Sequence, residues 1–313
     1  MYSRIVRRCM IPVTAAGLLF MAGCGSNTGA ADALSAPVEQ KVYDISGDYS
    51  RLDIQADLAD IVIQPGAAAS MEVSLESGYE MEQVIEDDTL YLTERDRQPF
   101  WQKIFHFRSV HNSVVITLPE NVIEELVVSS GVSDINISGQ KIHSISVKES
   151  NADVILSDCE GNDIQIENTN GDVKLQNITA DLKAELQNGN FQLLDSSGSS
   201  LYTTNQNGNI EASGAEYSGI DAASANGSID LKRVKTDSIS VSNRNGNVSL
   251  ELDGKQAAFD YDITNSNGKV MIGNDTVGTF HTEFQFSNNA GKQLTADMGN
   301  GNLTVTFLET SQE

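Results

Sequence analysis

The sequence of 313 residues has little cysteine, little aromatic content and few basic side chains. Its cysteines are Cys9 and Cys24 near the start and an isolated Cys159, so we expect no disulfide framework and treat Cys159 as a small packed residue. Lys and Arg number 20 against 44 Asp and Glu, a formal charge of −24 that disfavours nucleic acid as a partner. Aromatic residues make up 6%, which suits a slender core filled by Val, Ile and Leu rather than a thick globular one.

The signatures of catalysis and metal binding are missing as well. The sequence has no Gly-x-Ser-x-Gly nucleophile elbow and no phosphate-binding loop, and its histidines have no metal-ligand spacing. These histidines are His106, His111, His143 and His281. We therefore predict no catalytic residue, no metal ligand and no cofactor, and we expect that the chain is not an enzyme.

What the chain does have is a repeat. An Asn-Gly pair followed by an apolar-polar-apolar run recurs at steps of 18 or 19 residues, which is typical of a solenoid. The copies begin at Asn170, Asn188, Asn207, Asn226 and Asn245, and a related copy without the Gly begins at Asn151.

The repeat has a simple physical logic. Asn and Gly turn a chain sharply at little steric cost, and the alternating residues after them form a strand with one buried face. A second alternating run fills each period, and about 19 residues are too few for a unit with a crossover helix. We therefore predict an all-β, single-stranded β-helix (β-solenoid) with coils of about 19 residues and an irregular N-terminal β cap.

Identical turn residues should then stack as a ladder from coil to coil. The third motif position gives the ladder Asp153, Asp172, Asn190, Asn209, Ser228 and Asn247. Asp60 and Asp134 extend the acidic part, since Asp134 lies 19 residues before Asp153. Carboxylates one coil apart could share a calcium ion, or they could face solvent and merely favour the turn, and no EF-hand or nonapeptide motif supports a metal here.

The N-terminal part indicates export and anchoring. Residues 1–23 have a basic start, an apolar stretch and a small-residue end, as expected of a signal peptide. The ending Met21-Ala22-Gly23-Cys24 resembles a bacterial lipobox, which would make Cys24 the lipidation site; the alternative is a secretory signal with an incidental cysteine. A diacylated Cys24 would bind the membrane stably. Residues 24–40 are predicted to be a lipid-anchored flexible linker.

We expect residues 41–125 to form the N-terminal β cap and first coils with an inserted hairpin, and residues 126–309 to form the solenoid repeat domain. The later copies at Asn267 and Asn300 follow at longer steps, and large residues near them should fill a closing end. One segment, residues 94–112, is basic and aromatic on an acidic chain. It is either a membrane-binding or partner-binding loop or a hairpin whose aromatics plug the open coil. The contact residues would be Phe100, Trp101, Lys103, Phe105, Phe107 and Arg108.

Taken together, the leader, the strand ending Thr117-Leu118-Pro119 and the serial Asn-Gly repeats resemble the bacterial "putative adhesin" β-strand-repeat family, whose domains have no established function. The resemblance implies a right-handed β-helix on the extracytoplasmic side of the membrane. We expect a surface-anchored, non-enzymatic scaffold or adhesin-like binding module of the cell envelope, with an envelope polymer or protein as its partner and a role in envelope stress implied by the resemblance. The alternatives are a carbohydrate-active β-helix enzyme (a polysaccharide lyase or hydrolase) and a calcium-dependent adhesive module.

Overall fold

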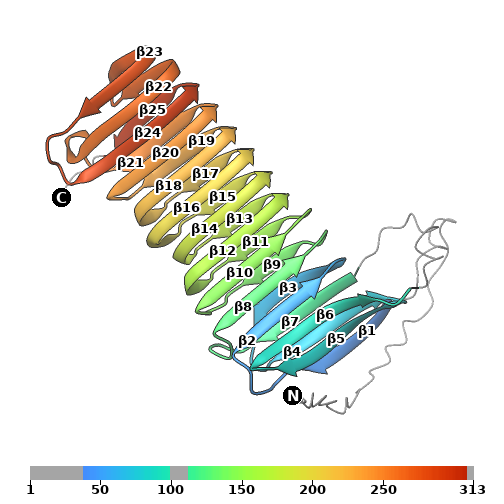
Figure 1. Ribbon diagram of the computed structural model, residues 1–313. Coiled ribbons are helices and arrows are strands. Elements are labelled where there is room, and N and C mark those ends of the chain that lie inside the picture. Colours follow the sequence, from blue (N-terminus) through green and yellow to red (C-terminus); the bar gives the residue numbers. More distant parts are fainter. Residues whose placement is uncertain (1–37, 99–111, 309–313) are drawn as a thin grey trace, which may run out of the picture.

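The computed structural model describes residues 38–98 and 112–308. In these residues the chain consists of 25 β-strands and one 3-10 turn, and all the strands join a single, mostly parallel sheet. Figure 1 shows the strands stacked like rungs along a rod, with the N-terminal strands at one end and the C-terminal strands at the other. The prediction of an all-β solenoid is confirmed.

Each middle coil contributes one long and one short strand, and we call the two sides of the rod the long-strand face and the short-strand face. The long-strand face is formed by β8 (Glu125–Ser130), β10 (Ser144–Glu149), β12 (Glu160–Asn170), β14 (Thr179–Asn188), β16 (Ser197–Asn207), β18 (Glu216–Asn226) and β20 (Ser238–Asn245). The short-strand face is formed by β9 (Ile135–Ser138), β11 (Val154–Ser157), β13 (Val173–Gln176), β15 (Phe191–Leu194), β17 (Ile210–Ser213), β19 (Ile229–Val234) and β21 (Val248–Asp253).

The core lies between these two faces. Strands pair in parallel with their copies one coil away, so that Val173 lies between Val154 and Phe191, and Phe191 lies next to Ile210. All four side chains are fully buried. Because alternate residues of a strand point to opposite sides, an apolar-polar-apolar run repeated in register fills the interior with a continuous apolar column. The predicted alignment of these residues is confirmed.

At the N-terminal end the coils do not follow the order of the chain. This end contains β1 (Val38–Asp44), β2 (Arg51–Ala56), β3 (Ala59–Pro65), β4 (Ser70–Glu76), β5 (Tyr79–Glu86), β6 (Thr89–Asp96) and β7 (Asn112–Leu118). The coil of β2 and β3 lies directly against β8 and β9, and β6 and β7 lie outside it. The antiparallel strands β1, β4 and β5 complete the cap. Strand β1 begins at Val38 and so takes in the end of the predicted linker.

The C-terminal end has the same arrangement. It contains the 3-10 turn η1 (Gln256–Ala258), β22 (Phe259–Ile272), β23 (Asp275–Phe286), β24 (Lys292–Asn300) and β25 (Leu303–Leu308). Strands β24 and β25 lie directly against β20 and β21, and β22 lies outside them under the antiparallel strand β23. The sequence order of the copies at Asn267 and Asn300 is therefore reversed in the stack, which corrects the expectation that coils simply lengthen toward this end.

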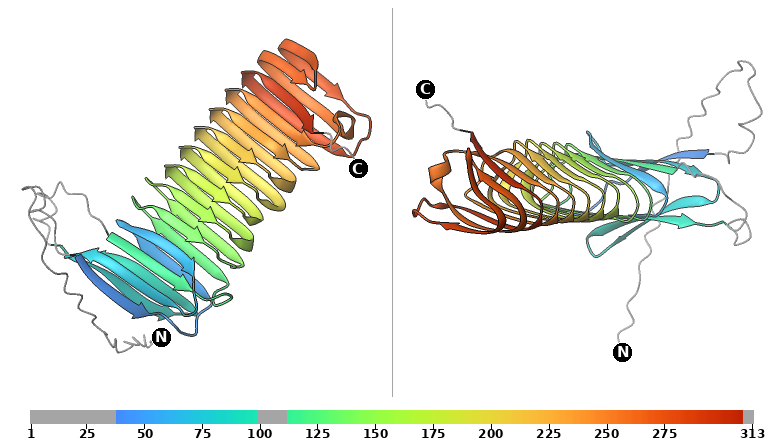
Figure 2. Two further views of the ribbon diagram at one scale, coloured as in Figure 1. Left: turned by 180° about the vertical axis from the view of Figure 1, so that it is seen from behind. Right: turned by 90° about the horizontal axis from the view of Figure 1, so that it is seen from above.

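Both ends are thus closed by antiparallel strands, which Figure 2 shows beyond the regular coils. The prediction that large residues fill the closing C-terminal end holds for Phe259 and Tyr261, which are buried. It is wrong for Phe280 and Phe286, which lie on the outermost strand and are largely exposed.

Candidate functional site

From Gly171 onward the corner between the two faces is built on glycines, whereas the copy at Asn151 has Ala152 at this position. Gly208 has φ +146°, and a Cβ added to it would lie 1.8 Å from the carbonyl oxygen of Gly189 in the preceding coil. Backbones of successive coils therefore touch at this corner, and Gly is required both for its conformation and for its size.

The asparagine before each corner glycine belongs to a ladder of side-chain hydrogen bonds. Asn207 Nδ2 donates to Asn188 Oδ1 at 2.9 Å, and Asn226 Nδ2 donates to Asn207 Oδ1 at 3.0 Å. The ladder runs through Asn151, Asn170, Asn188, Asn207, Asn226, Asn245, Asn300 and Asn267. Sequence reasoning missed this ladder and assigned side-chain stacking to the residue after the glycine. The constant Asn of every copy was the signal that could have revealed it.

The residue after the glycine makes a different contact. Asp153 Oδ1 accepts the backbone N–H of Asp172 at 2.8 Å, and Asp172 Oδ1 accepts the backbone N–H of Asn190 at 2.9 Å. Asp60 and Asp134 contact the next coil in the same way. These carboxylates are therefore acceptors for the backbone of the neighbouring coil, a role that fits Asp or Asn equally well.

No group of three or more His, Cys, Asp or Glu side chains in residues 38–98 and 112–308 is arranged to hold a metal ion. Each carboxylate of the acidic ladder Asp60, Asp134, Asp153 and Asp172 uses Oδ1 to accept a backbone N–H of the neighbouring coil, and the sharing of a calcium ion along this ladder stays a prediction.

A second set of asparagines supports the corner from inside. Asn205 and Asn243 are buried and donate Nδ2 to the corner carbonyls of Gly189 and Gly227, at 2.8 and 2.9 Å. Asn168 and Asn265 make equivalent contacts. Since these residues lie two positions before a ladder asparagine, the pattern Asn-x-Asn-Gly could have been read from the sequence.

Cys159 lies in the opposite corner and is buried, as predicted. Its Sγ is 3.3 Å from the carbonyl oxygen of Ser157, and burial raises the pKa of the thiol. A thiol that stays protonated and inaccessible is a packed structural residue rather than a reactive one.

One open groove of about 500 Å³ crosses neighbouring coils on the long-strand face beside the ladder corner. Its lining is Thr204, Asn205, Gln206, Ala223, Ser224, Ala225, Ser242, Asn243, Arg244, Ser266, Asp297, Met298 and Gly299. Asp297 is the one carboxylate among these residues, and its Oδ1 accepts a hydrogen bond from Thr264 Oγ1 at 2.9 Å. Acid-base cleavage of a glycosidic bond needs two convergent carboxyl groups, and this groove does not bring two together.

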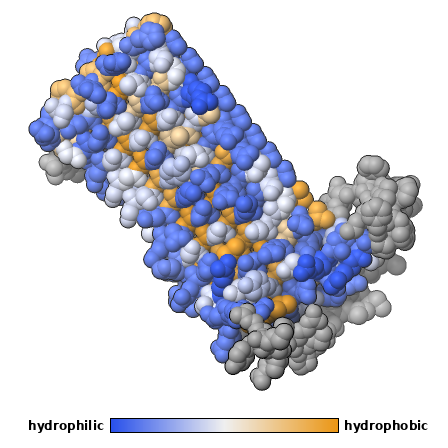
Figure 3. Space-filling model, viewed as in Figure 1, coloured by the Kyte–Doolittle hydropathy of each residue, from blue (hydrophilic) through white to orange (hydrophobic). Residues whose placement is uncertain are grey.

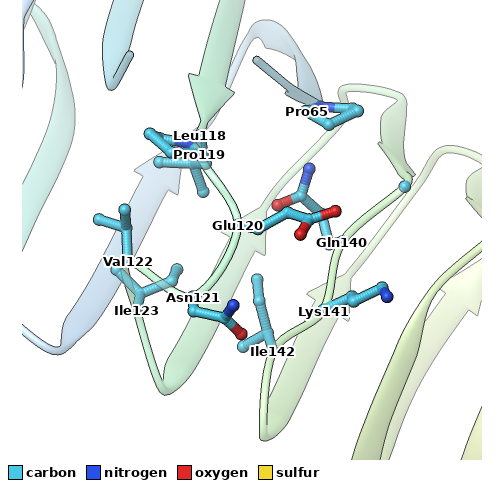
Figure 4. Close-up of a pocket in the computed structure, with 11 residues that line it drawn as sticks. Pro65, Leu118, Pro119, Glu120, Asn121, Val122, Ile123, Gln140, Lys141 and Ile142 are labelled. Atoms are coloured by element: carbon cyan, nitrogen blue, oxygen red, sulfur yellow. The ribbon is translucent and has the colours of Figure 1, made fainter. Parts of the chain in front are cut away.

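A small crevice marks the place where the chain passes over a coil. The connection from β7 to β8 crosses the flank of the β2–β3 coil, and Pro65, Leu118, Glu120, Gln140 and Lys141 are among the residues around the crevice (Figure 4). Its volume of about 10 Å³ is roughly enough for one water molecule, so the crevice is too small for a ligand.

The remaining predicted site residues lie outside the described part of the chain. These are the lipidation residue Cys24 and the contact residues Phe100, Trp101, Lys103, Phe105, Phe107 and Arg108. Two neighbouring basic residues are described, and both pair across the β5–β6 hairpin. Arg95 lies 3.0 Å from Glu82, and Arg97 lies 2.6 Å from Glu80.

Figure 3 shows a mostly hydrophilic surface with apolar residues interspersed along the rod. In the described residues no helix is long and apolar enough to cross a membrane. In the described part of the chain, the corner ladders, the two faces and the groove on the long-strand face define a capped β-solenoid.

The chain belongs to the Toastrack DUF4097 family, whose sequence profile matches residues 49–306. No protein of curated function matches the chain.

Solved structures resemble this chain at low sequence identity, and the two with TM-scores of 0.51 share its fold. A "putative lipid binding protein" from Parabacteroides distasonis is 12% identical with a TM-score of 0.51, and the match covers 85% of this chain and 96% of that one. A "putative adhesin" from Parabacteroides merdae is 9% identical with a TM-score of 0.51, covering 85% and 95%. Another from Bacteroides fragilis is 14% identical with a TM-score of 0.45, covering 88% and 98%.

Proposed function

We propose that this protein is a lipid-anchored, non-enzymatic binding or scaffold module on the extracytoplasmic face of a bacterial membrane. The observation that carries the proposal is the rod of stacked coils with long, mostly hydrophilic faces, whose groove on the long-strand face contains one carboxylate, Asp297, among its described lining residues. Such a rod holds a binding surface at a distance from its anchor, because a solenoid extends along one axis with each coil supported by its neighbours.

Anchoring through Cys24 is tested by fractionation. Cys24→Ser should move the protein from the membrane to the soluble fraction, since the two acyl chains that hold it would be missing. Cys9→Ser, a change inside the leader, is the matched control and should leave the protein on the membrane. Membrane retention of Cys24→Ser would contradict the anchor.

Binding at the envelope is tested with the soluble Cys24→Ser chain and isolated host envelope. We expect saturable binding without release of soluble sugar or peptide fragments. Fragment release would support the carbohydrate-active enzyme instead, and Asp297→Asn would then show whether the groove carries that activity.

The segment of residues 94–112 is proposed as a contact for the membrane surface or a partner. Trp101 is the sole tryptophan, so its fluorescence reports on this segment alone. If Phe100, Trp101, Lys103, Phe105, Phe107 and Arg108 contact lipid, vesicles containing anionic lipid should shift the emission of Trp101 to shorter wavelength. An emission maximum already at short wavelength and unchanged by vesicles would support the plug.

A further inference from the structure

Strand β23 leaves one edge of the rod open. It pairs along β22 in antiparallel register, and among the described residues no strand lies on its other side. Two of its side chains, Phe280 and Phe286, are 61% and 47% exposed. An exposed strand edge presents unpaired N–H and C=O groups that can pair with a strand of another chain.

The free edges at the other end of the rod carry charges that oppose such pairing. Strand β5 has Glu80, Glu82 and Glu86, and strand β1 has Glu39 and Lys41. Charged side chains on an edge strand are a common protection against edge-to-edge association. Strand β23 is less protected: its charged residues Asp275 and Glu283 lie toward the two ends, and residues 276–282 between them contain no Asp, Glu, Lys or Arg.

The two ends also differ in total charge. Residues 38–98 contain fifteen Asp and Glu against four Lys and Arg, whereas residues 254–308 contain five against three. Two N-terminal ends, or two rods side by side, would repel each other strongly. Two C-terminal ends can approach with little repulsion, so the C-terminal end is the part of the surface best suited to a second copy of the same acidic chain.

From these observations we infer that β23 is a self-association surface, at which the open edge pairs in antiparallel fashion with the β23 of a second copy. Antiparallel pairing of a strand with itself satisfies a two-fold axis, which is the commonest symmetry of protein dimers. The product is a tail-to-tail dimer in which the sheets of two rods become continuous.

The bend in β23 fixes where the two-fold axis lies. Residues 282–286 pair with one arm of β22 and residues 275–278 with the other, and His281 has φ +45° at the bend between them. When the two-fold axis passes through the bend, residues 282–286 of each copy pair with residues 275–278 of the other copy. Phe280 then lies next to its own counterpart, and its ring, which stacks edge-on against His281 at 4.1 Å, becomes buried.

The dimer is tested first by mass. Sedimentation equilibrium of the full chain in detergent should give a reversible monomer–dimer equilibrium, and Phe280→Lys should weaken the dimer by at least about tenfold. Phe280 is exposed, so this change should leave the melting temperature of the monomer unaltered. Val84→Lys on the exposed edge strand β5 is the matched control and should not change the dimer. A monomer at all concentrations up to about 100 µM, or a dimer broken by Val84→Lys and not by Phe280→Lys, would refute the inference.

The register is tested by cross-linking. Single cysteines at positions 276, 279, 280 and 285 are introduced in turn and oxidised with diamide. Covalent dimer should be most abundant at 279 and 280, beside the axis, and should decrease toward 276 and 285. Equal yields at all positions, or yields no higher than at an exposed control position such as Tyr202→Cys, would overturn strand pairing.

The biological consequence rests on the proposed anchoring at Cys24, while the dimer itself does not. A rod tethered by its N-terminal end presents β23 at its membrane-distal tip, so two rods on facing membranes could join through their tips. Vesicles bearing the acylated chain should then aggregate, and those bearing Phe280→Lys should not. If the anchor fails, Cys24→Ser will remain on the membrane; if the pairing fails, the mass and cross-linking results will show it independently.

Discussion

The middle coils and the two caps stack their coils differently, although the C-terminal cap has the same Asn-Gly corner and the N-terminal cap has the same aspartate contact to the next coil at Asp60. From β8 to β21 each coil lies on the one before it in the chain. At each end, the coil that packs against the middle coils is not the next one in the chain. It is β2–β3 at the N-terminal end and β24–β25 at the C-terminal end. The repeat therefore specifies how two neighbouring coils pack, but it does not specify which two coils become neighbours.

This difference has a topological reason. A solenoid built in strict chain order would end on a bare parallel edge over an open core. At the N-terminal end the chain makes the inner coil β2–β3 before the outer coil β6–β7, whereas at the C-terminal end it makes the outer strand β22 before the inner coil β24–β25. In both cases antiparallel strands next to the outer coil cover it, namely β4 and β5 at one end and β23 at the other. The caps are therefore part of the solenoid's own connectivity.

The largest effect is expected at the corner glycines of the middle coils. Gly208→Ala should destabilise the protein by about 5 kcal/mol, because its Cβ would collide with the backbone of the preceding coil. Gly219→Ala is the matched control, since a Cβ there meets nothing within 4 Å, and it should be nearly neutral. Urea unfolding followed by circular dichroism measures both. Similar losses for the two variants would mean that the corner does not control stacking.

Next in size is the contrast between a core aromatic and a cap aromatic. Phe191→Ala should cost about 3–4 kcal/mol, because the fully buried ring lies between Val173 and Ile210 and would leave a cavity. Phe286→Ala on the exposed edge of the cap should cost less than about 0.5 kcal/mol. Thermal unfolding of the two variants checks the difference, and equal shifts would contradict the placement of Phe191 inside the core and of Phe286 at its exposed edge.

The Asn ladder should show an effect that depends on position. Asn207 both donates and accepts within the ladder, whereas Asn267 lies at its end and donates to Asn300 only. We expect Asn207→Ala to cost about 1–3 kcal/mol and Asn267→Ala to cost about half as much. The midpoints of urea unfolding measure both losses. A larger loss of stability for Asn267→Ala than for Asn207→Ala would contradict the prediction that a residue with two ladder bonds contributes more than a residue with one.

The smallest predicted effect is the difference in stability loss between hydroxyl removal at two buried tyrosines, Tyr261 and Tyr217. The hydroxyl of Tyr261 in the C-terminal cap donates to the carbonyl oxygen of Gln256 at 2.7 Å, while the buried hydroxyl of Tyr217 in the middle has no protein partner. Tyr261→Phe should cost about 1 kcal/mol, and Tyr217→Phe should be neutral or slightly stabilising. A larger loss for Tyr217→Phe would mean that its hydroxyl has a partner in solution.

Alkaline pH provides an independent measurement of the same cap residue. Burial raises the pKa of Tyr261 from its ordinary value of 10.0 to about 12. The unfolded chain therefore loses this proton first, and stability should fall as pH rises from 10 toward 12. Tyr261→Phe should make that decline in stability shallower. An unchanged pH dependence would mean that the ionisation of Tyr261 does not contribute to the decline.

Much of the fold could be predicted because its signals are local. The Asn-Gly pair and the alternation after it fixed the corner, the strand and the buried positions such as Val154 and Phe191. The stacking of Asp153 on Asp172 also followed from the period. What the two aspartates contact did not follow, because a carboxylate can serve a cation or a backbone N–H equally well, and only the spacing of the coils shows which lies within reach.

The order of the end coils could not be predicted for a related reason. Every copy of the motif fits on every other copy, so the sequences around Asn267 and Asn300 are equally suited to lie on Asn245. The packing of the closing strands selects between them, and that packing involves residues far apart in the chain.

Local sequence therefore specifies the repeat unit of this protein: its corner, its buried face and the contact between one coil and the next. The order in which the end coils stack, the strands that close them and the edge of β23 that stays unpaired among the described residues all depend on contacts between distant parts of the chain. The physical reason is that alternation and turn chemistry act over a few residues, whereas the choice among equivalent neighbours depends on which long connections leave no core exposed.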